Sequence, residues 1–371
     1  MKPRTYAALV SVAAALVGNS NTSQLTLAIN SVDDWQELAS EAEIHGLSVM
    51  LGRLSANGEI KLPRELDLQL KALTIRHKRI LAARRIVLAE VIDLFNRHNI
   101  AFAFLKGAAL ANLIYDPPWL RPMRDIDILV DGENALQAQK LLREIDFTNE
   151  DYAAGYLFEH HHLPNSTRLQ DGFTISLEIH HDALSGDVDT SITLKTLVDQ
   201  LQSFEFSGKT AYAFGHSDML KHLCFHTFEP AEVIKLGSMV DMVRYADYFA
   251  NEIDWPALER TQPYTVNALR CIHAMIPLPA VLREKLIKFD AEQWNPSQIG
   301  KGFMPLSKIA RLNNGRDKFS ALFAPSQWWK HIFYAVPPGK SLFFTHLIRH
   351  PVTIGKWIFR RYRAAEKSKA I

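Results

Sequence analysis

The sequence RDIDILV, residues 124–130, constrains the fold more than any other segment of the chain. In an extended strand successive side chains point to opposite faces, so Asp125 and Asp127 would project together, with their Cα atoms about 6 to 7 Å apart. Ile126, Ile128 and Val130 would then pack into a core on the opposite face. The pattern predicts a strand with one apolar face and one face whose two carboxylates could share a metal cluster.

The segments on both sides of this strand predict a sheet covered by helices. Residues 101–105 have the composition of a strand, Lys106-Gly107 that of a turn, and residues 133–147 the amphipathic pattern of a helix that packs on a sheet. Residues 155–169 and 171–184 predict two further strands joined by a turn. The order is therefore strand, helix, strand, helix, and then two strands.

Helical periodicity dominates the rest of the chain. It runs from about residue 31 to residue 99, with a long helix after Pro63, and it returns after residue 216. We expect three regions: a helical N-terminal region (1–98), a core that carries the strands (99–182), and a mainly helical C-terminal region with a basic tail (183–371).

Composition narrows the class of protein. The 371 residues are 47% hydrophobic and 22% charged, which is ordinary for a globular chain of two or three units. The formal net charge of +2 is too small to indicate a nucleic-acid partner, and none is expected. Cys224 and Cys271 lie in apolar stretches without metal-ligand spacing, so we expect reduced core thiols and a cytoplasmic protein.

The N-terminus allows two interpretations. Lys2 and Arg4 precede an apolar run over residues 6–17, as in a short signal sequence, but no A-x-A cleavage site follows and the run is too short to span a bilayer. We favour an ordinary helix that packs on its neighbours. No later segment reaches the 18 or so consecutive apolar residues that a transmembrane helix needs.

The long helix also carries a basic cluster. We favour a solvated helix face, whose basic residues pair with nearby acidic residues, over a surface that binds nucleic acid. The residues concerned are Arg76, Lys78, Arg79, Arg84 and Arg85.

A third carboxylate extends the chemistry of the aspartate pair. Apolar and polar residues alternate strictly over 173–180, which places Glu178 on the polar face of its strand. Two aspartates on one strand and a carboxylate on a later strand of the same sheet form an arrangement that holds two Mg²⁺ ions for phosphoryl or nucleotidyl transfer. Asp125 and Asp127 would be shared ligands, and Glu178 would serve the nucleophile's metal and accept its proton.

Basic residues near these carboxylates could contact phosphate. A glycine at the Lys106-Gly107 turn would let a phosphate approach the helix N-terminus, where Lys106 could reach it. Arg121 and Arg124 could bind a triphosphate or neutralise the carboxylates. Alone, a D-x-D pair can be a solvated edge and a Lys-Gly turn can serve only the backbone. Their combination, in this order, favours an active site.

These residues resemble the uncharacterised bacterial nucleotidyltransferase family of the DNA polymerase β-like superfamily. The resemblance covers most of the chain, from the helix near residues 35–54 to His226, Lys235 and Asp241. The segments that carry it are Leu105-Lys106-Gly107, Tyr115, Arg121-Pro122, residues 125–130, residues 161–164 and Glu178-Ile179-His180.

The resemblance implies an α+β fold, in which a small mixed sheet is flanked by helical N-terminal and C-terminal regions. It also implies transfer of an NMP from an NTP, although the acceptors are generally undefined. Two features depart from the superfamily pattern. Lys106-Gly107 replaces the usual Gly-Ser, which removes a serine hydroxyl from the phosphate site, and the loop at residues 116–122 adds to the usual spacing.

Histidines offer a competing zinc hypothesis. His160 and His162 could act together on a strand whereas His161 would point away, and the pair His180-His181 follows later. We favour hydrogen-bonding partners of the carboxylates, or plain strand histidines. His222 and His226 are spaced i, i+4 but lack the glutamate of H-E-x-x-H, which favours a buried histidine. His226, Lys235 and Asp241 are candidates for the acceptor side.

We therefore expect an Mg²⁺-dependent nucleotidyltransferase that uses an NTP, with ATP the expected one, and an unknown acceptor such as a small molecule, sugar, peptide or protein. The alternative is a non-catalytic nucleotide-binding or scaffold protein of a biosynthetic pathway. A third hypothesis, a membrane-surface adaptor, rests on the aromatic and basic residues 356–363. A terminal helix docked on the body, with its basic face solvated, is the favoured interpretation of that tail, although peripheral membrane contact stays open.

Overall fold

The computed structural model describes residues 1–18, 22–151, 156, 160–184, 191–197, 200–228, 233–286 and 309–369. The chain forms two compact units. The helical unit contains residues 1–71 and 223–359, and the sheet unit contains residues 72–222 and 360–371. The three regions expected from the sequence, 1–98, 99–182 and 183–371, stay a prediction.

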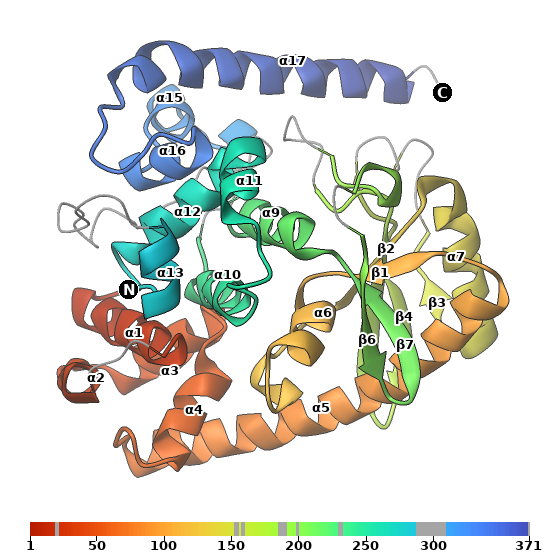
Figure 1. Cartoon of the computed structure of the whole chain (residues 1–371), viewed down its shortest axis with the longest axis horizontal. Helices are drawn as coiled ribbons and strands as arrows, with labels where there is room; N and C mark the ends of the chain where they lie inside the picture. The colour runs from red at the N-terminus through yellow and green to blue at the C-terminus, as the bar shows by residue number, and fades with distance from the viewer. Residues whose placement is uncertain are drawn as a thin grey trace. The chain divides into compact units, whose positions relative to one another are not determined.

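The helical unit is built almost entirely from helices (Figure 1), and their buried apolar side chains form its core. Cys224 and Cys271 are free and buried in it, as expected. Its elements are α1 (Pro3–Leu16), α2 (Thr22–Asn30), α3 (Trp35–Ile44), α4 (Ser48–Ala56), the first turns of α5 (Arg64–Arg97), the second half of α9 (His216–Phe228), α10 (Leu236–Tyr248), α11 (Trp255–Thr261), α12 (Pro263–His273), α13 (Ala280–Leu286), α15 (Gly315–Phe323), α16 (Gln327–Phe333), the π-helix Thr345–Arg349 and the first half of α17 (His350–Lys369).

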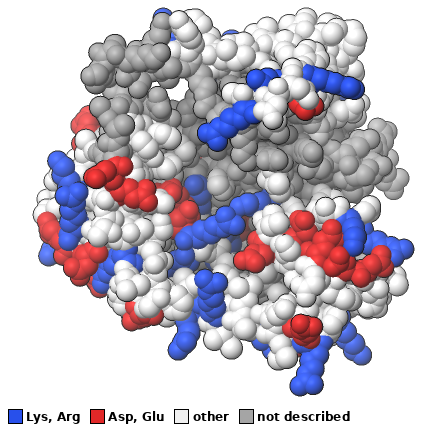
Figure 2. Space-filling model, turned by 180° about the vertical axis from the view of Figure 1, so that it is seen from behind, with Lys and Arg blue, Asp and Glu red and all other residues white. Residues whose placement is uncertain are grey.

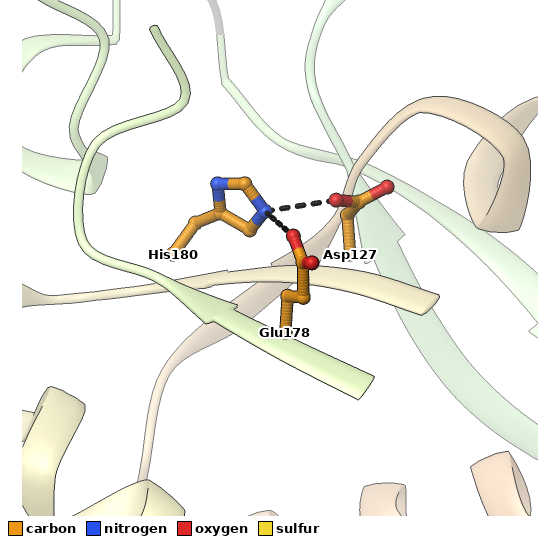
Figure 3. Close-up of side chains that lie close together, drawn as sticks. All are labelled: Asp127, Glu178 and His180. Carbon is orange, nitrogen blue, oxygen red and sulfur yellow. Dashed lines mark hydrogen bonds and ion pairs between the residues drawn. The ribbon is translucent and has the colours of Figure 1, made fainter. Parts of the chain in front are cut away.

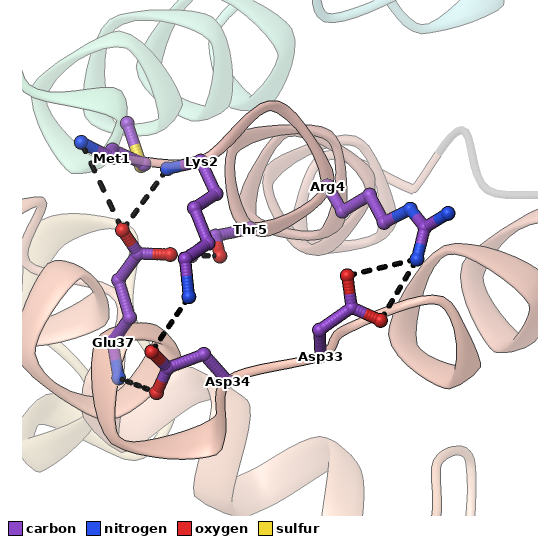
Figure 4. Close-up of polar contacts among 7 residues, drawn as sticks. All are labelled: Met1, Lys2, Arg4, Thr5, Asp33, Asp34 and Glu37. Atoms are coloured by element: carbon purple, nitrogen blue, oxygen red, sulfur yellow. Dashed lines mark hydrogen bonds and ion pairs between the residues drawn. The ribbon is translucent and has the colours of Figure 1, made fainter.

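The N-terminal helix α1 is fastened to the start of α3 by polar contacts (Figure 4). Lys2 Nζ lies 2.9 Å from an Asp34 carboxylate oxygen, and Arg4 lies 2.8 Å from Asp33. The Thr5 hydroxyl donates to Glu37. With Ala8, Leu9, Val12 and Ala13 buried, the prediction of a packed helix is confirmed. Among the described residues, no helix combines the length and the apolar character that crossing a bilayer requires.

The sheet unit contains one seven-stranded mixed sheet in the order β3-β4-β5-β2-β1-β7-β6. β2 runs parallel to β5 and β1 parallel to β7, whereas the other neighbours are antiparallel. The predicted α+β fold is thus confirmed. The strands are β1 (Phe102–Phe104), β2 (Ile126–Val130), β3 (Thr148–Asn149), β4 (Ser166–Gln170), β5 (Phe173–His180), β6 (Gln202–Phe206) and β7 (Lys209–Ala213).

Helices cover the sheet as its amphipathic segments predict. α6 packs on β2, and α7 packs on β5. The helical elements of this unit are the main part of α5, α6 (Lys106–Leu113), α7 (Ala135–Leu141), the first half of α9, the second half of α17 and the 3₁₀ turns η1 (Pro118–Leu120), η2 (Gly132–Asn134), η3 (Leu142–Ile145) and η4 (Leu194–Thr196).

One strand is shorter than the sequence predicted. Of the expected strand 155–169, residues 152–155 and 157–159 lie outside the described residues, and regular pairing begins only at Ser166. Before it, His162 forms an isolated bridge to His180. Pro164 has no N–H to donate to a ladder, which accounts for the interruption.

Surface charges of the sheet unit are largely matched. Lys209 lies 2.8 Å from Asp93, and Lys195 lies 2.8 Å from Glu133. Figure 2 shows acidic and basic side chains interspersed on the face that it draws. Pairs of this exposed kind contribute little to stability, about 0 to 1 kcal/mol each.

Candidate active site

Asp127 lies at the centre of a polar cluster on an otherwise buried strand. All five residues of β2 are buried, and Asp127 pairs directly with Glu178 of β5 in the parallel ladder. Its Oδ1 accepts hydrogen bonds from Lys106 Nζ at 3.0 Å and His180 Nε2 at 2.8 Å. Burial opposes ionisation, but the Lys106 charge and the His180 hydrogen bond hold the pKa of Asp127 well below its ordinary value.

Glu178 and His180 extend from one face of β5 toward Asp127, because residues i and i+2 of a strand share a face (Figure 3). His180 Nε2 lies 3.5 Å from Glu178 Oε2. Burial would raise the pKa of Glu178, yet the His180 hydrogen bond lowers it overall. Burial would likewise lower the pKa of His180, whereas its bonds to both carboxylates raise it. His180 therefore stabilises the charges of both carboxylates, and they stabilise its protonated form.

Asp125 stands at the entrance of β2 rather than within it, since the first strand residue is Ile126. The pKa of Asp125 is raised by burial and by the charges of Asp127 and Glu178. Asp125 thus shares their electrostatic field. Its role as a metal ligand stays a prediction.

Lys106 occupies a strained position at the start of α6. Its φ is +43°, a left-handed conformation that costs a side-chain-bearing residue on the order of 1 kcal/mol. Burial would lower the pKa of Lys106, but Asp127 raises it overall. The backbone N–H of Leu105 also donates to the Asp127 carbonyl at 3.0 Å, so the turn is fixed to β2 by two bonds.

Gly107 is favoured by a close approach rather than by its φ. A Cβ at this position would lie 3.0 Å from Met123 Cβ and 3.6 Å from Arg121 Nη1. Arg121 itself donates to the Pro122 carbonyl beside it. Arg124 is exposed. Arg121 is thus placed beside the α6 N-terminus, and phosphate contact by either arginine stays a prediction.

Arg84 is a site residue that the sequence interpretation missed. It was expected on a solvated helix face, which is wrong, since only 6% of its surface is exposed. Its guanidinium donates to the carbonyls of Met123 and Arg124, both at 2.7 Å, just before Asp125. Burial lowers the pKa of Arg84 to about 10. Its i, i+3, i+4 spacing to buried Val87 and Leu88 could have revealed the inward orientation.

The histidines gather more closely than strand alternation predicted. The rings of His161 and His162 both approach that of His180, with centroids 5.3 and 5.2 Å away, so the expectation that His161 points away is wrong. Burial lowers the pKa of His161 to about 2, which keeps it neutral. The break in pairing before Pro164 removes the regular alternation on which the expectation depended.

The candidates on the acceptor side do not belong to the unit that holds this cluster. His226, Lys235 and Asp241 belong to the helical unit, where Lys235 precedes α10 and Asp241 is buried within it. Their role stays a prediction. His222 is different, since it belongs to the sheet unit. Burial lowers its pKa to about 3, and the charges of Lys106 and Asp127 also act on it.

The donor set of the cluster fits a divalent cation. One ligand atom each from Asp127, Glu178 and His180 lie within 4.8 Å of one another. Two carboxylates suit a hard cation such as Mg²⁺, and imidazole is a common additional ligand for transition metals. Burial and then the charges of Asp127 and Glu178 raise the pKa of Asp125, and a bound cation would offset those charges.

The chain is similar to a known family and to solved structures. Residues 31–276, more than half of the chain, match a family described as "Uncharacterised nucleotidyltransferase". No curated protein is significantly similar in sequence. One similar solved structure is an antigenic nucleotidyltransferase-like protein from Paracoccidioides brasiliensis, with 15% identity, a TM-score of 0.33 and coverage of 45% of this chain and 77% of that one. Another is the antibiotic-resistance factor ANT(2'')-Ia, with 10% identity, a TM-score of 0.30 and coverage of 48% and 96%.

Proposed function

Because this chain belongs to the uncharacterised nucleotidyltransferase family, we propose that it moves an NMP from an NTP, with ATP the expected donor, to a hydroxyl-type acceptor in an Mg²⁺-dependent reaction. The observation that carries the proposal is the pairing of Asp127 with Glu178 on adjacent parallel strands, with Lys106 bonded to the same aspartate. Two facing carboxylates beside a cation at a helix N-terminus suit a metal-bound triphosphate.

Asp127, Glu178 and Asp125 would hold the metal ions. Bound Mg²⁺ would neutralise the triphosphate and lower the pKa of the acceptor hydroxyl. In the transfer, the acceptor oxygen forms a bond to the α-phosphorus, the bond to the bridging oxygen breaks, and pyrophosphate leaves. The acceptor's proton passes to Glu178, whose lowered pKa supports an ionised carboxylate at neutral pH. We propose that the site binds two Mg²⁺ ions.

Other side chains would bind and orient the donor. Lys106 and the free N–H groups at the start of α6 would contact phosphate, and Arg121 lies beside that helix end. His180 would keep Asp127 and Glu178 in position by its two contacts. The acceptor, whether small molecule, sugar, peptide or protein, is left to experiment.

The test uses α-labelled NTPs, Mg²⁺ and a metabolite and protein extract. We expect a labelled product with the parent protein and at least about a hundredfold less with Asp127→Asn or Glu178→Gln. Asp93→Asn and Glu133→Gln are matched controls, because both residues lie in surface ion pairs. NTP binding without product across the acceptors sampled would overturn the proposal in favour of a non-catalytic nucleotide-binding protein. Equal labelling by Asp127→Asn would remove the assigned site.

A further inference from the structure

Large apolar side chains are exposed along the C-terminal helix α17 and the π-helix before it. We call these residues the outer stripe as a name for the set, because each of them exposes more than half of its surface. Scattered exposed apolar residues are ordinary, whereas a contiguous patch indicates an interaction. The outer stripe consists of Phe343, Phe344, Leu347, Ile348, Val352, Ile358 and Phe359.

The outer stripe is not needed to hold the helix in place, because the opposite side of the helix does so. Ile354 and Trp357 are buried, and the ring of Trp357 meets that of Phe333 at 5.4 Å. His350 accepts a hydrogen bond from the Tyr334 hydroxyl at 2.6 Å and donates to the Leu322 carbonyl at 2.7 Å. Figure 1 shows α17 lying across α15 and α16 of the helical unit. The helix is therefore docked by one face and presents the other.

In the sequence, the charged residues between Asp317 and Glu366 are all basic, although Lys330 among them is buried. Residues 318–365 contain no aspartate or glutamate, although 40 acidic residues in 371 would place about five in a segment of this length. The same segment contains eight lysines and arginines. They are Lys318, Lys330, Lys340, Arg349, Lys356, Arg360, Arg361 and Arg363.

Helical spacing puts apolar and basic positions side by side. Val352, Gly355 and Phe359 follow the i, i+3, i+7 spacing of one line along the helix. Lys356 lies one position after Gly355, which places it on the adjoining line, and it is exposed. The exposed Lys340 stands just before the turn that holds Phe343 and Phe344. An apolar line bordered by lysines is the pattern of helices that lie in the plane of a membrane interface.

We infer that the outer stripe docks on the surface of an anionic bilayer, with α17 parallel to the membrane and the apolar side chains inserted among the lipids. Charge complementarity decides the occupant. Acidic headgroups would neutralise the basic border, whereas a second copy would bring two basic borders together. The inference does not depend on nucleotidyl transfer, so either can fail alone.

The test is sedimentation of the full chain with vesicles of phosphatidylcholine alone or with 30% phosphatidylglycerol, at low and high salt. We expect binding to the anionic vesicles, weakened by salt and by at least about tenfold in the triple variant Phe344→Ser, Leu347→Ser, Phe359→Ser. Lys340→Gln with Lys356→Gln should weaken it by at least about fivefold.

Matched controls replace apolar residues that are exposed elsewhere. The variant Leu136→Ser, Leu169→Ser, Tyr248→Ser removes comparable exposed area and should bind as the parent does. Equal binding of the parent and the stripe variant would overturn the inference. So would analytical ultracentrifugation that shows a dimer of the parent, dissociated in the stripe variant, because a second copy would then occupy the stripe. Circular dichroism melts check that each variant folds.

Discussion

Replacing Arg84 by methionine separates the stability of the fold from the placement of Asp125. The guanidinium makes two hydrogen bonds to backbone carbonyls, and bonds of this charged kind contribute about 1.5 to 3 kcal/mol each. Their loss would cost about 3 to 6 kcal/mol. Against this, the fall of the Arg84 pKa from 12.5 to about 10 corresponds to a penalty of about 3 kcal/mol for burying the charge, which methionine avoids. The net loss of stability should be about 0 to 3 kcal/mol.

The effect on activity should be larger than the effect on stability. The two carbonyls belong to Met123 and Arg124, so their release frees the segment that leads to Asp125, whereas Asp127 keeps its bonds to Lys106 and His180. A displacement of about 1 Å at a catalytic group can cost about a hundredfold in rate. We expect the rate of label transfer at saturating NTP to fall by about that factor, with the apparent KM for NTP changed by less than about threefold.

Two further variants sharpen this test. Arg84→Lys can reach one carbonyl at a time and should give an intermediate rate. Arg85→Met is the matched control, because Arg85 lies on the same helix but bonds Ser207 on the exposed side. Denaturation in urea gives the stability of each variant. A normal rate for Arg84→Met, or equal losses for Arg84→Met and Arg85→Met, would refute the positioning role.

Three further predictions concern backbone strain, packing and pH. Lys106→Gly should be more stable than Lys106→Ala by about 1 kcal/mol in urea denaturation, because only glycine relieves the positive φ, and equal stabilities would contradict the strain. Gly107→Ala should cost about 1 to 3 kcal/mol, because its Cβ would press on Met123, and a neutral result would show that the loop yields freely. His350 has its pKa lowered to about 4, so the unfolded chain binds its proton more readily between pH 6.5 and 4. Stability should therefore fall as the pH drops through that window, and His350→Gln should flatten the slope measured by urea denaturation at a series of pH values.

Local periodicity in the sequence was enough to predict the strands and the residues on their polar faces. The alternation over 126–130 and 173–180 located Asp127 and Glu178, but their direct pairing depends on the parallel register between β2 and β5, which no local pattern encodes. The pairing of β7 with β1, which lies far away in the sequence, could not be predicted for the same reason. The i, i+2 rule also puts His180 beside Glu178, and the favoured role of the histidines as partners of the carboxylates is confirmed for His180.

Long polar side chains were harder to place than apolar ones. Arg84 belongs by composition to a basic helix face, and only its tertiary partners, two carbonyls of a distant loop, explain its burial. The expected separation of His161 from His162 failed because it assumed regular strand geometry where the ladder is broken. Both errors have the same cause, because the contacts that place Arg84 and His161 join residues far apart in the sequence or depend on how the strand is paired.

The charges of the cluster suggest that the Lys106 side chain changes its partner when a metal ion binds. In the structure its ammonium group neutralises the charge of Asp127. A bound divalent cation would neutralise that charge equally well. Once a cation holds Asp127, the lysine is electrostatically redundant there and can turn to a phosphate at the adjacent α6 N-terminus. We expect Lys106→Met to bind Mn²⁺ at least as tightly as the parent in an electron paramagnetic resonance titration, while its KM for NTP rises about tenfold or more. Weaker Mn²⁺ binding with an unchanged KM would instead make Lys106 a support of the carboxylate alone.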